Sequence, residues 1–152
     1  MPEEEKSLIH FSIGPVQQFI ESARTVRDLW TGSYMLSWLT ARAMAAALGQ
    51  GGELMSDELD KNPLVCFHRD GTKPQGKEKD LLASCLPNTF LAEFSGDEDK
   101  LKSVGEDIKQ AVVGEWQAIA KAVHKDLNEE RIGPTGWDKY WDHQIDNHWD
   151  IR

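Results

Sequence analysis

HFSIGPVQQFIESARTVRDLWTGSYMLS, residues 10–37, changes its hydrophobic period at Pro15. Over residues 8–13 every second side chain is apolar on the same face, which is the pattern of a half-buried strand. Proline suits the start of a helix, because its fixed φ fits there and its missing N–H is not needed. Apolar residues then recur at helical spacing as far as Ala23, so the stretch predicts a strand that turns directly into a helix.

The middle of the chain predicts a second helix and a second strand. A helical run continues to the turn cluster GQGG at residues 49–52, with a kink expected at Thr31-Gly32-Ser33. PLVCFH, residues 63–68, is a short apolar run rich in strand formers. The polar, turn-forming segment RDGTKPQGKEKD, residues 69–80, follows it and predicts a long loop.

The last third of the chain completes a βαββαβ order. Residues 89–94 alternate and predict a third strand that forms a hairpin with the second. An apolar stripe predicts a long helix over residues 97–127, and a short helical segment follows the break GPTG at 133–136. A last strand is expected at 148–152. This order predicts an α+β fold, the ferredoxin-like plait, with an antiparallel sheet and helices on one face.

Length and composition limit the classes of function. A chain of 152 residues predicts one domain, and because it stops within its last expected strand, we expect residues 1–152 to be a fragment of a longer subunit. The formal net charge of −9 makes the domain a poor nucleic-acid binder, although acidic surfaces often meet basic partners. No apolar run approaches the length of a signal sequence or membrane span, so a cytoplasmic location is expected.

The corner at residues 12–15 is the first candidate binding site. Free backbone N–H groups and the helix dipole at such a corner can hold a phosphate. The motif is neither GxGxxG nor GxxxxGK[ST], so a plain strand-to-helix turn is the favoured interpretation of these residues alone. Arg24, Arg27 and Asp28 follow at helical spacing. They suit either an anion clamp or surface ion pairs, and surface pairing is the default interpretation.

The sequence predicts no metal site. His143 and His148 are five residues apart and therefore lie on different faces of a helix, unlike a zinc-binding pair at i and i+4. The two cysteines, Cys66 and Cys85, are too distant in sequence for a CxxC pair and are interpreted as buried thiols.

An acidic stripe occurs near the end of the chain. Its aspartates recur at every fourth residue, beside a stripe of large apolar residues: Asp138, Asp142, Asp146 and Asp150, beside Trp137, Trp141, Ile145 and Trp149. Like charges at this spacing repel, so the acidic stripe faces either water or a cationic partner. We interpret it as a solvated face and the tryptophans as core or interface anchors.

Three blocks of sequence together resemble one known family. FSIGPVQQFIESARTVRDLWTGSYMLS (residues 11–37) resembles the signature of the large subunit of type III-B CRISPR–Cas (Cmr) effector complexes, a family related to nucleotide cyclases and polymerase palms. LPNTFLAEF (86–94) and WDHQIDNHWDI (141–151) resemble later blocks of that family, in the same order. The resemblance covers nearly the whole chain.

The resemblance implies a palm-like domain, the first of two in such a subunit. In this family ATP binds between the two palms and is joined into cyclic oligoadenylates when the complex holds target RNA. Ser12, Gly14, Pro15 and Gln17 match the family's strand-to-helix corner on the side where the palms meet. With Arg24 and Arg27, these residues are the expected nucleotide-binding positions; ATP and Mg²⁺ are expected only together with the second palm.

Departures from the family pattern limit the expected activity. The chain lacks both the GGDD motif, whose acidic pair holds two Mg²⁺ ions, and the His-Asp nuclease motif. We therefore expect no catalytic residues and no enzyme activity of the chain alone. The expected function is a non-catalytic palm that forms one wall of an ATP pocket. The alternative is a pure assembly module that contacts no nucleotide.

The resemblance also implies the partners. They are the second palm and the remaining domains of the large subunit, and the other Cmr subunits with guide RNA and target RNA. Because the chain is acidic, we expect it to make little direct contact with nucleic acid, and we expect no membrane contact.

Overall fold

The computed structural model describes residues 6–56, 58–71, 82, 85–129 and 136–152. The elements in chain order are β1 (Lys6–Gly14), α1 (Val16–Glu21), α2 (Val26–Gly49), β2 (Glu53–Leu54), α3 (Pro63–Asp70), β3 (Thr89–Ser95), α5 (Glu98–Glu129), α6 (Asp138–Asp146) and β4 (Asp150–Ile151). Of the segments expected from the sequence, residues 72–80 of the polar loop and 133–135 of the GPTG break lie outside this description.

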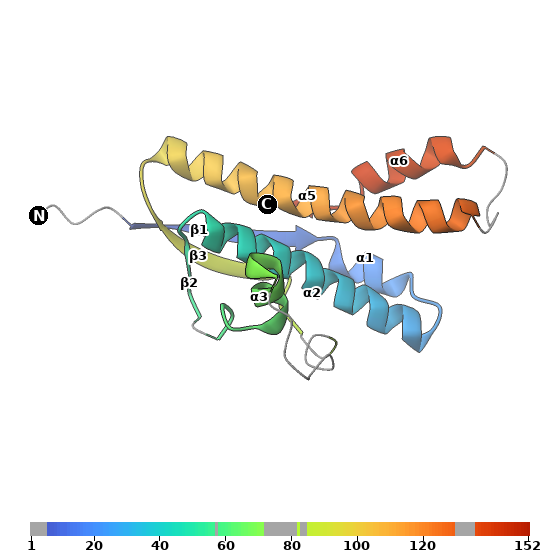
Figure 1. The fold of residues 1–152 in the computed structure, drawn as a ribbon, viewed down its shortest axis with the longest axis horizontal. Coiled ribbons are helices and arrows are strands. Elements are labelled where there is room, and N and C mark those ends of the chain that lie inside the picture. The colour runs from blue at the N-terminus through green and yellow to red at the C-terminus, as the bar shows by residue number, and fades with distance from the viewer. Residues whose placement is uncertain (1–5, 57, 72–81, 83–84, 130–135) are drawn as a thin grey trace, which may run out of the picture.

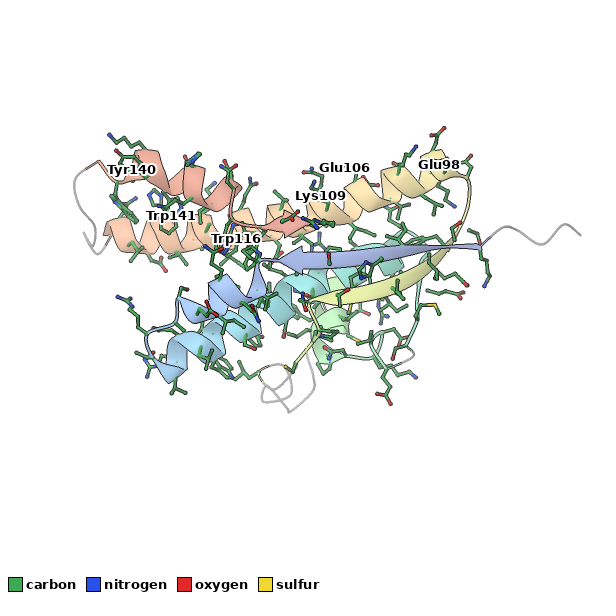
Figure 2. The ribbon with its side chains drawn as sticks, turned by 180° about the vertical axis from the view of Figure 1, so that it is seen from behind. Glu98, Glu106, Lys109, Trp116, Tyr140 and Trp141 are labelled. Atoms are coloured by element: carbon green, nitrogen blue, oxygen red, sulfur yellow. The ribbon has the colours of Figure 1, made fainter. Side chains whose placement is uncertain are left out.

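The four strands form one antiparallel sheet in the order β2-β3-β1-β4. This is the strand order of the ferredoxin-like plait, so the α+β prediction is confirmed. β1 pairs with β3 from Lys6↔Ser95 to Ser12↔Thr89, and its last two residues pair with β4. The helix α2 lies in front of the sheet in Figure 1, and the sheet lies in front of α2 in Figure 2.

The core lies between the sheet and the helices α2 and α5. The inward face of β1 contributes Phe11 and Ile13, and Phe11 stacks on Phe90 of β3 with ring centroids 5.0 Å apart. The predicted apolar stripe of α5 supplies further buried residues to this core, namely Val104, Ile108 and Val112. The opposite face of the sheet is more open, because the alternate positions of β1, such as Leu8, are exposed.

The prediction of a strand at residues 63–68 is wrong, because PLVCFH forms the helix α3. The side chain of Asn62 caps this helix by accepting a hydrogen bond from the backbone N–H of Leu64 at 2.9 Å. Pro63 occupies the first turn, and Gly71 ends the helix in the left-handed conformation with φ of 71°. These end signals outweigh the strand propensity of the six residues between them.

The true second strand is β2, which is only two residues long and follows α2 directly. It pairs with β3, so the expected neighbour of the third strand is present but comes from a different segment. The expected kink at residues 31–33 is also wrong, since α2 is continuous through them. The break between helices lies earlier, at 22–25, where the Thr25 side chain accepts the backbone N–H of Asp28 at 3.1 Å.

The other predicted elements are confirmed. The strands at the two ends, the third strand, the long helix and the short helix after the break are β1, β4, β3, α5 and α6. Within the described part of the chain, no helix is both long and apolar enough to cross a membrane.

Exchanging Gly52 for alanine tests the packing between the end of α2 and β3. A Cβ atom at Gly52 would lie 2.4 Å from Cζ of Phe94 and 2.9 Å from the carbonyl oxygen of Ala47. We expect Gly52→Ala to lower the free energy of unfolding by about 1–3 kcal/mol, measured by urea denaturation. Gly114→Ala on α5 is the control, because it meets open space and should stabilise by about 0.5–1 kcal/mol. Equal stability of the two variants would contradict this packing.

Candidate functional site

The corner at the end of β1 is held by hydrogen bonds from two sides. Ser12 and Arg152 exchange backbone hydrogen bonds of 2.7 and 3.0 Å, and the N–H of Ile13 donates to the carbonyl of Asn88 at 3.0 Å. The N–H groups of Ser12 and Ile13 are therefore already used, so the expectation that they are free for a ligand is wrong. The backbone N–H groups of the first turn of α1 have no partners within the helix, and no side chain of the described residues caps them at Pro15.

The remaining corner residues connect β1 to α1. The Gly14–Pro15 peptide bond is cis, and Pro15 has extended backbone angles, so it precedes the helix instead of occupying its first position. Gln17 is exposed on the first turn of α1. The helix is only six residues long and has no buried residue. It lies against α2, at the end of the molecule away from the N-terminus of β1 (Figure 1).

A polar cavity of about 470 Å³ adjoins this corner, between α1 and the end of α6. Its lining consists of Pro15, Gln18, Phe19, Ser22, His143, Gln144, Asn147 and His148. The lining offers amide, hydroxyl and imidazole groups but no carboxylate, ammonium or guanidinium group. The geometry therefore suits a neutral ligand with several hydrogen-bonding atoms. Of the predicted site residues, Pro15 lies at this cavity.

His148 is held in the cavity wall by aromatic rings. It stacks on Trp116 of α5 with centroids 5.6 Å apart, and Phe19 of α1 meets its edge at 5.3 Å. Its Nε2 atom is buried and has no hydrogen-bond partner among the residues that the structure describes. Burial lowers the pKa of His148, so the ring is neutral near pH 7 and adds no charge to the cavity.

Arg24 and Arg27 are exposed at the junction of α1 and α2 and do not line the cavity. Asp28 does not clamp an anion with them, because its side chain caps α2 by accepting the backbone N–H of Arg24 at 3.2 Å. Within the described ranges, neither guanidinium is in an ion pair. Along the chain, Arg24 follows Ser22 of the cavity wall by two residues and Arg27 follows it by five.

The metal and cysteine expectations can be compared with the structure only over the described residues. These residues contain no group of three histidine, cysteine or acidic side chains that could hold a metal ion. His143 and Asn147 instead contact each other through the Asn147 amide, which donates to the His143 carbonyl at 2.8 Å. Both cysteines are free; Cys66 is half-buried, but Cys85 is exposed, which corrects the expectation that both are buried.

The aspartates of the acidic stripe are exposed, as predicted, but three of the four contact other side chains of the domain. Asp138 contacts Nε2 of His124 on α5 at 2.8 Å, and the ring of His124 stacks on Trp141. Asp146 and Asp150 also have partners within the domain. In the described part of the chain Asp142 has no such partner, so it is the aspartate most available to a cationic partner.

The sequence analysis identified the corner but missed most of the cavity. The missed residues are Gln18, Phe19, Ser22, His143, Gln144, Asn147 and His148. Their only signal was that both contributing segments fall within blocks of the family resemblance. The two segments are more than 100 residues apart, and nothing in their spacing brings them together.

Comparison with known proteins identifies related sequences. The family model "CRISPR-associated protein Cmr2, N-terminal" matches residues 8–121. The CRISPR system Cmr subunit Cmr2 of Pyrococcus furiosus is 30% identical over 108 residues, which are 70% of this chain and 12% of the relative. The chain thus spans about an eighth of the length of this relative.

The lowered pKa of His148 predicts a loss of stability in acid. Because the folded protein binds this proton more weakly than the unfolded chain does, the unfolded chain gains protons first as the pH falls through about 6.5. We expect the free energy of unfolding to decrease from pH 7.5 to 5.5, and His148→Gln to remove part of that decrease. His143→Gln, an exposed control, should leave it unchanged. An NMR titration that places the His148 ring at or above 6.5 would contradict this assignment.

Proposed function

The chain belongs to the CRISPR-associated protein Cmr2 N-terminal family, and from this membership we propose that it is a non-catalytic palm domain of the large subunit of a type III-B Cmr complex. In this proposal the domain forms one wall of the ATP pocket that serves cyclic oligoadenylate synthesis. Its partners are the second palm and the other domains of the subunit, and through them the remaining subunits, guide RNA and target RNA.

The polar cavity beside Pro15 is the observation that carries the proposal. Its volume of about 470 Å³ lies within the range of ligand pockets in proteins. Its amides and neutral imidazole suit the hydrogen-bonding edge of a nucleobase or the hydroxyls of a ribose. The buried, unpartnered Nε2 of His148 is a further hydrogen-bonding atom that a ligand can satisfy.

The charged part of ATP requires groups outside this cavity. Arg24 and Arg27 are the nearest guanidinium groups along the chain after α1, and exposed arginines suit phosphate oxygens. The cavity lining contains no carboxylate that could bind Mg²⁺. The proposal therefore assigns Mg²⁺ and the chemistry of phosphoryl transfer to the second palm, and the binding of one part of the nucleotide to this domain. Ser12, Gly14 and Gln17 belong to it as the corner that positions α1.

A pure assembly module is the second candidate function. Asp142 favours it, because this aspartate is exposed and has no partner among the residues that the structure describes, and the acidic face of α6 suits a basic partner subunit. Under this alternative, Asp142→Lys abolishes assembly of the complex, whereas substitutions in the cavity have no effect on ATP binding.

The two candidates predict different effects of changing the cavity. Gln18 and Gln144 are exposed amides of the lining, so replacing both with alanine should not disturb folding. In a reconstituted complex we expect the double variant Gln18→Ala, Gln144→Ala to weaken ATP binding about tenfold, because each lost hydrogen bond is worth about 0.5–1.5 kcal/mol. Equilibrium binding of labelled ATP and the yield of oligoadenylate measure the effect.

Gln110→Ala is the matched control, because it removes an exposed amide of α5 that does not line the cavity. It should leave ATP binding unchanged, and analytical ultracentrifugation should show all these complexes fully assembled. Wild-type ATP affinity of the assembled double variant would refute a nucleotide site at this cavity. If Asp142→Lys also prevented assembly, the assembly module would be the better account.

A further inference from the structure

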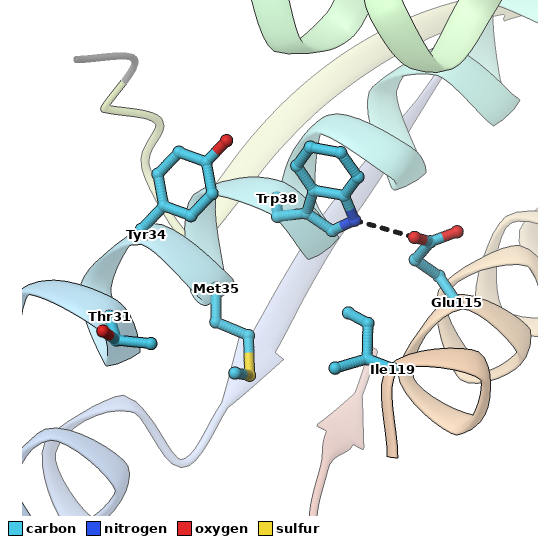
Figure 3. A pocket seen from close by; sticks show the side chains of 6 residues that line it. All are labelled: Thr31, Tyr34, Met35, Trp38, Glu115 and Ile119. Atoms are coloured by element: carbon cyan, nitrogen blue, oxygen red, sulfur yellow. Dashed lines mark hydrogen bonds between the residues drawn. The ribbon is translucent and has the colours of Figure 1, made fainter. Parts of the chain in front are cut away.

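A second pocket, which is apolar and has a volume of about 300 Å³, lies between α2 and α5. It shares no lining residue with the polar cavity. It is lined by Thr31, Tyr34, Met35, Trp38, Glu115 and Ile119 (Figure 3). Its volume is at the lower end of the range for ligand pockets, which suits a single side chain better than an extended ligand. Two of its walls are aromatic, and one residue of the lining carries a charge.

The charged residue is Glu115, and its carboxylate is fixed in position. The indole N–H of Trp38 donates to Oε1 of Glu115 at 2.7 Å, as the dashed line in Figure 3 shows. A carboxylate has about four acceptor positions, so this bond leaves others for a ligand. Within the described residues no ion pair neutralises Glu115. The pocket therefore combines a held anion with aromatic faces.

The first turns of α2, which lead to the pocket, expose several large apolar side chains. The buried residues of α2 begin at Leu36, and none of the ten residues before it is buried. Val26 is 83% exposed, Leu29 44% and Trp30 49%. Trp30 stacks on Tyr34 with ring centroids 5.3 Å apart, and Tyr34 lines the pocket. The exposed aromatic surface of α2 is therefore continuous with the pocket wall. Contiguous apolar surface of this kind marks interaction sites.

The charges around the pocket favour a cation at its Glu115 end. Arg27 lies on the first turn of α2, one turn before Thr31 of the pocket lining. It is about 16 Å from Trp38 along the helix axis, so the Glu115 end of the pocket is beyond the range of unscreened interaction at physiological salt. Arg42 lies one turn beyond Trp38 and does not line the pocket. Arg42 lowers the pKa of His68, whereas Glu115 raises it. The net charge of −9 adds to the attraction for a basic partner.

We propose that this pocket binds an arginine side chain of a partner protein, which docks on the uncovered first turns of α2. A guanidinium group is planar and weakly hydrated, so it can stack on Tyr34 or Trp38 and donate to Glu115 at the same time. An ammonium group is a compact, strongly hydrated charge and gains less from aromatic walls. The apolar residues of α2 supply the contact area around this anchor, as arginine hot spots in interfaces require.

The indole N–H resonance of Trp38 is a direct reporter of the pocket. Titration of the ¹⁵N-labelled chain with N-acetyl-arginine amide should shift this resonance saturably, in the millimolar range expected for so small a ligand. N-acetyl-citrulline amide has the same shape without the charge and should not shift it. N-acetyl-lysine amide should bind at least several-fold more weakly than the arginine amide.

Substitution of Glu115 tests the held anion. Glu115→Gln should weaken arginine-amide binding about tenfold or more, because hydrogen bonds to charged groups are worth about 1.5–3 kcal/mol. Glu106→Gln makes the same charge change on the same helix (Glu106 is labelled in Figure 2) and should have no effect, because Glu106 does not line the pocket. Urea denaturation of both variants verifies that they are folded.

A peptide tests whether the exposed first turns of α2 contribute to binding of the partner. A helical peptide with one arginine among leucines should bind at least about tenfold more tightly than N-acetyl-arginine amide, because it also covers Val26, Leu29 and Trp30. Four results would each overturn the proposal: no saturable shift, equal binding of the citrulline or lysine amide, wild-type affinity of Glu115→Gln, or a peptide no tighter than the single amino acid.

Discussion

β1 is hydrogen-bonded along both edges, to β3 over most of its length and to β4 at its last residues. This double pairing makes it the strand from which both halves of the fold are positioned. Its inward face holds Phe11 and Ile13 in the core, and its end fixes where α1 begins. Because Ser12 is bonded to Arg152, the segment that follows α6 is held beside the Gly14–Pro15 corner. The polar cavity exists because these two segments are brought together there.

The sequence predicted those parts of the fold in which one local signal dominates. β1 and β3 are half-buried and alternate, and α5 has a continuous apolar stripe, so their periods identify them. Residues 63–67 form an apolar run without a period, and there the capping signals at Asn62 and Gly71 were decisive. β2 has only two residues, which is too short for any period to appear.

The site was predictable only where it depends on neighbouring residues of the sequence. The corner at Pro15 is local and follows from a change of period. The cavity beside it combines α1 with residues 143–148, and only the pairing of β4 with β1 brings them together. The pocket at Glu115 likewise joins two helices that are far apart in sequence. Helical spacing indicates which face Trp38 shares with Tyr34, but it cannot indicate that Glu115 lies opposite.

The polar cavity and the pocket between α2 and α5 differ in the chemistry of their linings. The polar cavity is uncharged and lies where the strand-to-helix corner meets the end of α6, which suits part of a nucleotide. The pocket between α2 and α5 is aromatic and carries one anion, which suits a basic side chain. The proposed role as a palm domain requires both kinds of surface, since such a domain would face a ligand on one side and neighbouring protein on another.

Photo-crosslinking tests the central claim, that this domain contacts the nucleotide through the cavity beside the corner. An assembled Cmr complex whose large subunit contains this domain would be irradiated with 8-azido-ATP in the presence of target RNA, and the modified peptides identified by mass spectrometry. The account predicts adducts within residues 15–22 or 143–148, suppressed by excess ATP. Adducts confined to other parts of the complex would contradict it.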